Sequence, residues 1–325
     1  MRKFVGIVFA SLLALVSFAD WRGAFDDAYF AQAVEPEMQE VLVWTQVAGL
    51  PIATATHGCA VLGSNLYCIG GMYSGGYLTN VWKFDGSSWS AATALPASIA
   101  FFSTATFGTN IFLMGGQGSL GSYTPYCFRF DGNSWTRIGN MPNGRNYSLA
   151  GVLGTNLYCI GGAKPGDDPE TGVYFLQTTG TWGTATALPG GNSFAGPIAP
   201  TFSNKLYSVS GGGENNPGIT NVWRFDGSSW EQTVGVKVGN ILGVSITYQD
   251  KIYQIAGNVG GTTVTNVYRF DGSQWVEIVG LPLPVQFVAA GVLDDKLYVV
   301  GGQYYSGGWV QRTNVFRLDI SFEPK

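Results

Sequence analysis

The chain has 325 residues, of which 46% are hydrophobic, 12% are charged and 14% are aromatic, and it contains 47 glycines. So little charge on so apolar a chain excludes a disordered protein, and a formal net charge of −4 excludes a basic surface for nucleic acid or anionic membranes. No long stretch of helical periodicity follows the first forty residues, so the composition favours short strands joined by tight turns.

Residues 1–19 are predicted to be a secretory signal peptide. Arg2 and Lys3 precede the apolar run 4–18, and small residues near its end predict cleavage after it. The run is short for a membrane span, and no later segment is apolar enough to be one. We therefore expect a secreted or periplasmic protein with no membrane insertion after signal cleavage, in which residues 20–41 form a linker or a short helix.

One eleven-residue motif then recurs along the chain. TNVWKFDGSSW (79–89) returns as TNVWRFDGSSW (220–230) and as TNVYRFDGSQW (265–275). The tryptophan that ends the motif belongs to a series of six, spaced 45–48 residues apart: Trp44, Trp89, Trp135, Trp182, Trp230 and Trp275. Segments such as LYCIGG (66–71) and LYVVGG (297–302) keep the same period.

This period, with paired glycines, an aromatic strand and then tryptophan, resembles the Kelch repeat. The resemblance covers residues 42–320 and implies an all-β fold, a six-bladed Kelch-type β-propeller. In the first blade we expect strands a to d at 58–63, 66–71, 80–85 and from Trp89 onward. Each sheet has two faces to bury, and neighbouring blades bury them for one another.

The repeat also predicts how the ring closes. No tryptophan strand follows TNVFRLDI near the C-terminus, whereas VWTQVAG (43–49) is an extra tryptophan strand at the other end. We therefore expect an N-terminal outer strand to complete blade six, with residues 321–325 as a C-terminal tail.

The recurrent residues have structural explanations. In FDGSSW the aspartate starts a turn and the glycine permits positive φ, while the tryptophan fills the wedge between blades. The paired glycines lie where a side chain would collide with neighbouring backbone. Blade three reads LQTTGTW (176–182) and lacks the turn aspartate.

The four cysteines leave the disulfide question open. Cys59 and Cys68 lie on adjacent strands of one hairpin, and Cys127 and Cys159 lie in neighbouring repeats. Either pair could form a disulfide in an exported protein, and all four could equally be buried free thiols.

A binding site is expected on the face that carries the long b–c and d–a loops, because these differ in every blade whereas the a–b and c–d turns are short and uniform. Aromatic, amide and charged side chains gather in them and suit a protein or glycan ligand. The candidate ligand-binding residues are Tyr73, Tyr77, Tyr123, Arg145, Tyr147, Glu214, Asn215, Tyr304, Tyr305, Trp309 and Arg312.

Residues that could carry catalysis are few, and we predict no catalytic residue, cofactor or metal. His57 is the one histidine, no G-x-S-x-G elbow accompanies it, and one histidine is too few for copper chemistry of the galactose-oxidase kind. GQGSLG (116–121) lies between antiparallel strands, where no helix could receive a phosphate. Asp167, Asp168 and Glu170 are interpreted as a solvated acidic loop rather than a calcium site.

A more distant resemblance gives the alternative. IGGAKPGDD (160–168) is similar to a stretch of N-acetylneuraminate epimerase, a sialic acid mutarotase, in which a glutamate and an arginine serve the sugar. Gly162 and Asp168 occupy those two positions here, although Arg145 and Glu214 could substitute from other loops. The sequence therefore favours a monomeric binding protein over a carbohydrate mutarotase.

Overall fold

The computed structural model describes residues 37–325 except 167, 178–179, 191–194 and 213–217. The predicted signal peptide and most of the predicted linker, up to residue 36, lie outside this part of the chain. Contacts divide the chain into a large unit, Glu40–Ser321, and a small one, Met1–Gln39 with Phe322–Lys325. None of the described segments is helical, so there is no helix there that could cross a membrane.

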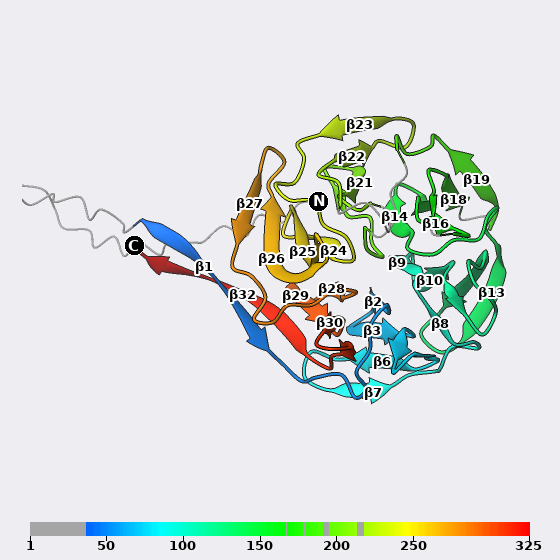
Figure 1. Cartoon of the computed structure of the whole chain (residues 1–325), viewed down its shortest axis with the longest axis horizontal. Helices are drawn as coiled ribbons and strands as arrows, with labels where there is room; N and C mark the ends of the chain where they lie inside the picture. The colour runs from blue at the N-terminus through cyan, green and yellow to red at the C-terminus, as the bar shows by residue number, and fades with distance from the viewer. Residues whose placement is uncertain (1–36, 167, 178–179, 191–194, 213–217) are drawn as a thin grey trace, which may run out of the picture. The chain divides into compact units, whose positions relative to one another are not determined.

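The large unit is a ring of six four-stranded antiparallel sheets, as predicted (Figure 1). Blade one contains β2 (Gly58–Leu62), β3 (Asn65–Ile69), β6 (Val81–Phe84) and β7 (Trp89–Ala91). Blade two contains β9 (Ser103–Phe107), β10 (Asn110–Met114), β12 (Tyr126–Phe130) and β13 (Trp135–Asn140). Blade three contains β14 (Leu149–Leu153), β15 (Asn156–Ile160), β18 (Val173–Gln177) and β19 (Trp182–Ala185).

The second half of the chain continues the pattern. Blade four contains β20 (Thr201–Phe202), β21 (Lys205–Val209), β22 (Val222–Phe225) and β23 (Trp230–Thr233). Blade five contains β24 (Val244–Tyr248), β25 (Lys251–Val259), β26 (Thr262–Phe270) and β27 (Trp275–Ile278). Blade six contains β28 (Ala289–Leu293), β29 (Lys296–Val300), β32 (Val315–Pro324) and β1 (Met38–Gln46).

The N-terminal strand β1 is the outer strand of blade six, so the expected closure is confirmed. β1 begins at Met38, before the predicted boundary at residue 42, and β32 runs to Pro324, so strand structure occupies most of the predicted tail. Trp44 is 7% exposed and donates its Nε1–H to the Val279 carbonyl of blade five (3.0 Å).

The blades meet through aromatic rings. The tyrosine of strand b in one blade contacts the phenylalanine of strand c in the next, as in Tyr67–Phe130 with ring centroids 5.4 Å apart. The same edge-to-face contact closes the ring between Tyr298 of blade six and Phe84 of blade one, also at 5.4 Å. Edge-to-face geometry is a favoured arrangement of such pairs. The same Tyr–Phe contact therefore joins neighbouring blades inside the ring and at its closure.

A second device is the tryptophan that starts each outer strand. Five of the six donate Nε1–H to a carbonyl of the preceding blade, at the fourth residue after that blade's own tryptophan. The pairs are Trp44 to Val279, Trp89 to Ala48, Trp135 to Thr93, Trp230 to Thr186 and Trp275 to Val234, at 2.8–3.0 Å.

Trp182 departs from this rule, because its buried Nε1 has no partner among the described residues. The equivalent acceptor would be Gly139, where β13 bulges against β12 and φ is 120°. A cavity of about 410 Å³ opens beside this joint, lined by Ile138 and Gly180 among others. In the part of the chain that the structure describes, the joint between blades two and three therefore lacks the tryptophan hydrogen bond that the other five joints have.

The turns between strands c and d confirm the role predicted for aspartate. Asp271 Oδ1 accepts hydrogen bonds from the Ser273 N–H (2.8 Å) and the Gln274 N–H (3.0 Å). These bonds lower the pKa of Asp271 to about 2, with the Gln274 N–H contributing most. Asp85, Asp131 and Asp226 have lowered pKa values for the same reason.

These turns should make the stability of the ring fall in acid. The carboxyl of Asp271 has its pKa lowered in the folded state, so its contribution is complete above about pH 4 and is lost as the pH falls toward about 2. Asp271→Asn, whose amide does not titrate, should therefore lose less melting temperature than the wild type between about pH 5 and pH 2. Circular dichroism melts across this range test the prediction, and equal losses in both proteins would contradict it.

Blade four has the shortest innermost strand, β20. Pro197 and Pro200 precede it and lack the N–H that a strand ladder requires. The chain here bridges instead to the neighbouring blade, where the Ala150 N–H donates to the Pro197 carbonyl (3.1 Å) and the Ala199 N–H donates to the Ala150 carbonyl (2.7 Å).

All four cysteines are buried and free, which selects one of the three alternatives that the sequence left open. Cys59 lies directly opposite Cys68 in the pairing of β2 with β3. Burial raises the pKa of the Cys127 thiol, and the nearby Cys159 raises it further.

Candidate functional site

One residue from each blade, just before the innermost strand, lines the axis of the ring. These six residues, which we call the collar, are Thr56, Phe101, Tyr147, Gly196, Leu242 and Phe287. The five that are not glycine have φ between 54° and 62°. Bulky residues rarely adopt this left-handed backbone, so its recurrence in five blades indicates that it shapes the axis.

Backbone hydrogen bonds join neighbouring collar residues. The Phe101 N–H donates to the Thr56 carbonyl (3.0 Å), and the Tyr147 N–H donates to the Phe101 carbonyl (2.9 Å). On the other side the Thr56 N–H donates to the Phe287 carbonyl (3.2 Å), and the Phe287 N–H donates to the Leu242 carbonyl (2.6 Å). Each left-handed residue costs on the order of 1–3 kcal/mol, and these bonds between blades partly offset that cost.

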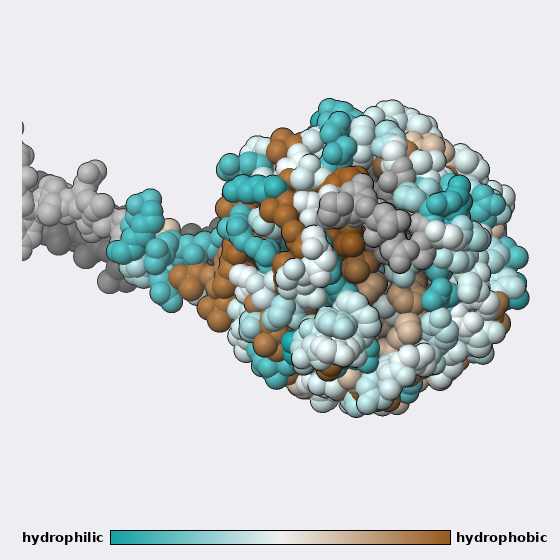
Figure 2. Space-filling view, in the orientation of Figure 1, coloured by the Kyte–Doolittle hydropathy of each residue, from teal (hydrophilic) through white to brown (hydrophobic). Residues whose placement is uncertain are grey.

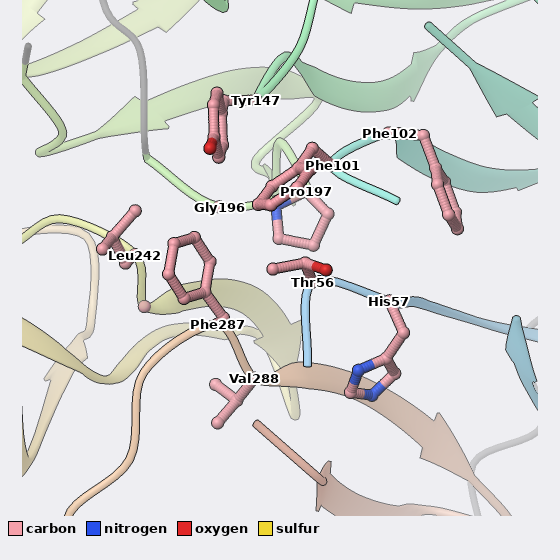
Figure 3. A pocket seen from close by; sticks show the side chains of 11 residues that line it. Thr56, His57, Phe101, Phe102, Tyr147, Gly196, Pro197, Leu242, Phe287 and Val288 are labelled. Carbon is pink, nitrogen blue, oxygen red and sulfur yellow. The ribbon is translucent and has the colours of Figure 1, made fainter. Parts of the chain in front are cut away.

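The collar surrounds a small cavity of about 40 Å³. The rings of Phe101 and Tyr147 lie 4.9 Å apart, and those of Phe101 and Phe287 lie 5.9 Å apart (Figure 3). Figure 2 shows hydrophobic residues at the centre of the ring face and along its left side, while its right edge is mostly hydrophilic or neutral. Of the described residues that line this cavity none is a carboxylate, so its chemistry is that of an apolar pocket with a phenol, a hydroxyl and an imidazole.

A wider channel of about 310 Å³ lies along the innermost strands of the blades. Its lining is small or aliphatic, apart from threonines whose hydroxyls are engaged. Thr106 Oγ1 donates to the Val61 carbonyl (2.6 Å), and Thr201 Oγ1 donates to the Val152 carbonyl (3.0 Å). These bonds tie the innermost strand of blade two to that of blade one, and that of blade four to that of blade three, so these threonines present no free hydroxyl to the channel.

Exposed aromatic side chains lie on two hairpins of the loop face. The first is β4 (Met72–Tyr73) with β5 (Gly76–Tyr77) in blade one, and the second is β30 (Gln303–Tyr305) with β31 (Trp309–Gln311) in blade six. We call Tyr73, Tyr77, Tyr305 and Trp309 the rim aromatics; their exposed fractions are 49%, 37%, 63% and 53%. The Tyr305 and Trp309 rings are 5.2 Å apart, edge to face.

Amide side chains connect these hairpins. Gln311 Oε1 accepts a hydrogen bond from the Ser74 N–H (3.3 Å), which joins blade six to blade one. Gln117, on the short strand β11 (Gln117–Gly118) of blade two, donates its Nε2–H to the Tyr77 hydroxyl (2.8 Å) and accepts at Oε1 from Asn146 Nδ2 of blade three (2.9 Å). The rim aromatics therefore lie on a surface whose hairpins are held together across blades.

The remaining short strands and bridges hold the other loops within single blades. They are β8 (Ile99–Ala100), which pairs with β11, and β16 (Ala163–Lys164), which pairs with β17 (Asp168–Pro169). Asn146 bridges to Ala163, and Gln286 bridges to Gln303. Each bridge fixes a d–a loop to the b–c hairpin of its own blade.

The other predicted site residues take several places. Tyr304 is half-buried beneath Arg312, whose guanidinium carbon lies 3.9 Å from the ring centroid. Burial lowers the pKa of Arg312. Tyr147 belongs to the collar, and Tyr123 is half-buried in the loop that precedes β12. Glu214 and Asn215 lie outside the described residues.

Arg145 is fully buried, although the sequence pattern placed it among ligand-binding residues. Its Nη1–H donates to the carbonyls of Gly161 (2.7 Å) and Gly172 (2.9 Å), and its guanidinium carbon lies 4.5 Å from the Tyr174 ring centroid. Arg145 thus provides hydrogen bonds to two backbone carbonyls of blade three and stabilises the b–c loop between them.

Sequence reasoning identified only Tyr147 among the collar residues and missed Thr56, Phe101, Gly196, Leu242 and Phe287. The six collar positions carry five different residue types, and only phenylalanine occurs twice, so no repeated letter marks this position in most blades. The signal that could have found the collar residues other than Gly196 is their fixed position two residues before the following strand a.

It also missed a sulfur-rich cluster beside the collar. One ligand atom each from His57, Cys59 and Cys68 lie within 4.8 Å of one another, and all three residues are buried. Burial alone raises the pKa of Cys59, but the adjacent Cys68 and His57 side chains outweigh it and lower that pKa to about 6. Burial and the neighbouring Cys59 raise the pKa of Cys68.

Comparison with known families agrees with this geometry. The Kelch motif matches residues 53–96 and 99–142, which contain blades one and two. The chain is a six-bladed propeller with Kelch motifs. The same Phe–Trp stacking and tryptophan hydrogen bonds extend the pattern to blades four and five of this Kelch propeller, as Phe225–Trp230 and Phe270–Trp275 show.

A solved structure titled "Structure of YjhT" is similar to this Kelch propeller, with a TM-score of 0.71 and 15% sequence identity. The match covers 85% of this chain and 99% of that one. At this identity the likeness concerns the fold. A comparison with curated protein sequences gives no significant match.

Proposed function

We propose that this Kelch propeller is an exported binding protein that holds a glycan on its loop face. The observation that carries the proposal is the exposure of Tyr305 (63%) and Trp309 (53%) on one hairpin, beside the exposed Tyr73 (49%) of the next blade. Large exposed apolar groups that are held in place are typical of binding surfaces. The flat faces of these rings suit the C–H faces of sugars.

The polar groups beside the rim aromatics support a glycan over a protein partner. Amide side chains both donate and accept hydrogen bonds, as sugar hydroxyls do. Gln311 lies half-buried on the same hairpin as Trp309, and the guanidinium of Arg312 stacks on Tyr304 of that hairpin. A protein hot spot would instead favour a deep apolar pocket, and the collar cavity, at about 40 Å³, is too small to receive a large side chain.

The buried position of Arg145 weighs against the mutarotase alternative. Recognition of a sugar carboxylate requires a cation that can reach it, and Arg145 is bound to the carbonyls of Gly161 and Gly172 at 0% exposure. Proton transfer at an anomeric carbon also requires an acid or base in reach, and the described lining of the collar offers no carboxylate for it.

A glycan array with the mature protein tests the proposal. Trp309→Ala and Tyr305→Ala should each weaken binding about tenfold, because truncation of an aromatic anchor removes most of its contact energy. Val276→Ala, at a 40% exposed position on the outer strand of blade five, is the matched control and should bind as the wild type does.

Two results would contradict glycan binding. One is a folded wild-type protein that retains no glycan above background, and the other is unchanged binding by both aromatic variants. Anomer interconversion of free reducing sugars, followed by proton-exchange NMR, should run at the rate of buffer alone. Acceleration by the protein would support the mutarotase alternative instead.

A further inference from the structure

Blade one also contains a cluster of one imidazole and two thiols. His57 precedes β2, Cys59 lies on β2, and Cys68 lies directly opposite Cys59 on β3. One nitrogen of His57 and the two sulfur atoms lie within 4.8 Å of one another. All three residues are 2% exposed, so the cluster is shielded from bulk water.

The imidazole of His57 gives an independent reason to look for a ligand. Both of its nitrogens are buried and neither has a hydrogen-bond partner among the described residues. A neutral imidazole carries one donor and one acceptor, and leaving buried polar atoms unpaired is costly. Figure 3 shows the imidazole ring of His57 pointing away from the aromatic rings of the collar.

We propose that His57, Cys59 and Cys68 bind one thiophilic metal ion with a filled d shell, Zn²⁺ or Cu⁺. Thiolate sulfur and imidazole nitrogen are the ligands that both ions prefer in proteins. Three such ligands leave zinc one further position for water, and they suffice for Cu⁺. The ion would satisfy one of the two unpaired nitrogens of His57 and join the two opposed sulfur atoms.

The geometry of the repeat does not impose this cluster. The positions equivalent to His57, Cys59 and Cys68 hold Phe102, Thr104 and Leu113 in blade two, and Val288, Ala290 and Val299 in blade six. Blade three keeps one of the three, Cys159, opposite Ala150. Three soft ligands therefore meet in blade one alone among the described positions of these four blades.

The axis offers a route to the cluster. His57 lines the collar cavity, and Cys59 lines the channel of about 310 Å³ along the innermost strands. An ion that enters along the axis would therefore reach His57 and Cys59 directly.

Metal titration of the full chain, reduced and handled without oxygen, tests the proposal. Alkylation should first show four free thiols. Co²⁺, used as the spectroscopic substitute for Zn²⁺, should then give a thiolate charge-transfer band that saturates at one ion per chain. Cu⁺ should bind with the same stoichiometry in competition with a colorimetric chelator, and mass spectrometry should find one metal per chain.

The repeat supplies variants that should fold. Cys68→Val and Cys59→Ala introduce the residues that blade six has at these positions, Val299 and Ala290, and each should lose the cobalt band. Cys159→Val removes the buried thiol at the equivalent position of blade three and should keep the band. The proposal is overturned if the folded, reduced wild type binds neither Co²⁺ nor Cu⁺, or if Cys68→Val keeps the full band.

Discussion

Trp44→Ala should lower the free energy of unfolding by about 3–5 kcal/mol, the usual cost of truncating a buried aromatic residue. Trp44 is 7% exposed and packs with apolar residues of blades five and six, including Val285 and Phe316. Its Nε1–H also donates to the Val279 carbonyl (3.0 Å), which joins the N-terminal strand to blade five. Since a domain of this kind is stable by only about 5–15 kcal/mol, the loss should be visible as a large shift in the denaturation midpoint.

Val43→Ala provides the matched control on the same strand. Val43 is adjacent in sequence but 50% exposed, so its truncation should change stability by about 0.5 kcal/mol or less. Urea denaturation followed by far-ultraviolet circular dichroism compares both variants without depending on tryptophan fluorescence. Equal midpoints for Trp44→Ala and Val43→Ala would show that the N-terminal strand does not hold the ring closed.

The rest of the closing strand acts in the same direction. Thr45 Oγ1 donates to Asp319 Oδ2 (2.6 Å), and the Val47 N–H donates to the Val315 carbonyl (2.9 Å). Arg317 forms a bidentate ion pair with Asp319, and this arginine, with smaller help from Thr45, lowers the pKa of Asp319. The closure therefore combines the buried indole of Trp44 with polar contacts between β1 and β32.

The fold could be predicted because its determinants are local and repeat. The aspartate of the c–d turn, the tryptophan that follows it and the paired glycines each satisfy a requirement of their own blade, so their letters recur. The prediction failed to see the bulge at Gly139 and the short innermost strand after Pro197, because single residues caused them in single blades.

The candidate site was less predictable because its residues do not repeat. Tyr73, Tyr77, Tyr305 and Trp309 were identifiable from loop composition, and they lie exposed on hairpins that the Ser74–Gln311 hydrogen bond links. Arg145 was assigned to the ligand from its charge and its place in a d–a loop, whereas the structure buries it. The meeting of His57, Cys59 and Cys68 depends on strand register, which the sequence indicated only as two adjacent strands.

The paired glycines carry the second prediction with a large effect. The second glycine of the pair approaches the d–a loop of its own blade so closely that a Cβ would collide with a carbonyl oxygen. At Gly162 the added Cβ would lie 2.5 Å from the Asn146 oxygen and 2.9 Å from the Ser148 nitrogen. The same approach occurs at Gly71, at 2.6 Å from the Ala55 oxygen. This explains the glycine at this position, because no side chain fits there without displacing backbone.

Gly162→Ala should therefore lower the free energy of unfolding more than Gly86→Ala does, by about 1–3 kcal/mol, the usual cost of forcing extra volume into a packed site. Gly86 is the matched control because its φ of 97° equals that of Gly162, while a Cβ there would meet nothing within 4 Å. The backbone strain of alanine is thus common to both variants, and the difference between them isolates the collision. Urea midpoints measure it, and equal midpoints would mean that the glycine is required only for its φ and not for the close approach of loop to hairpin. Because Asn146 also bridges to Ala163 at the start of the b–c hairpin, a confirmed difference would tie the packing of the paired glycine to the joint between the d–a loop and this hairpin.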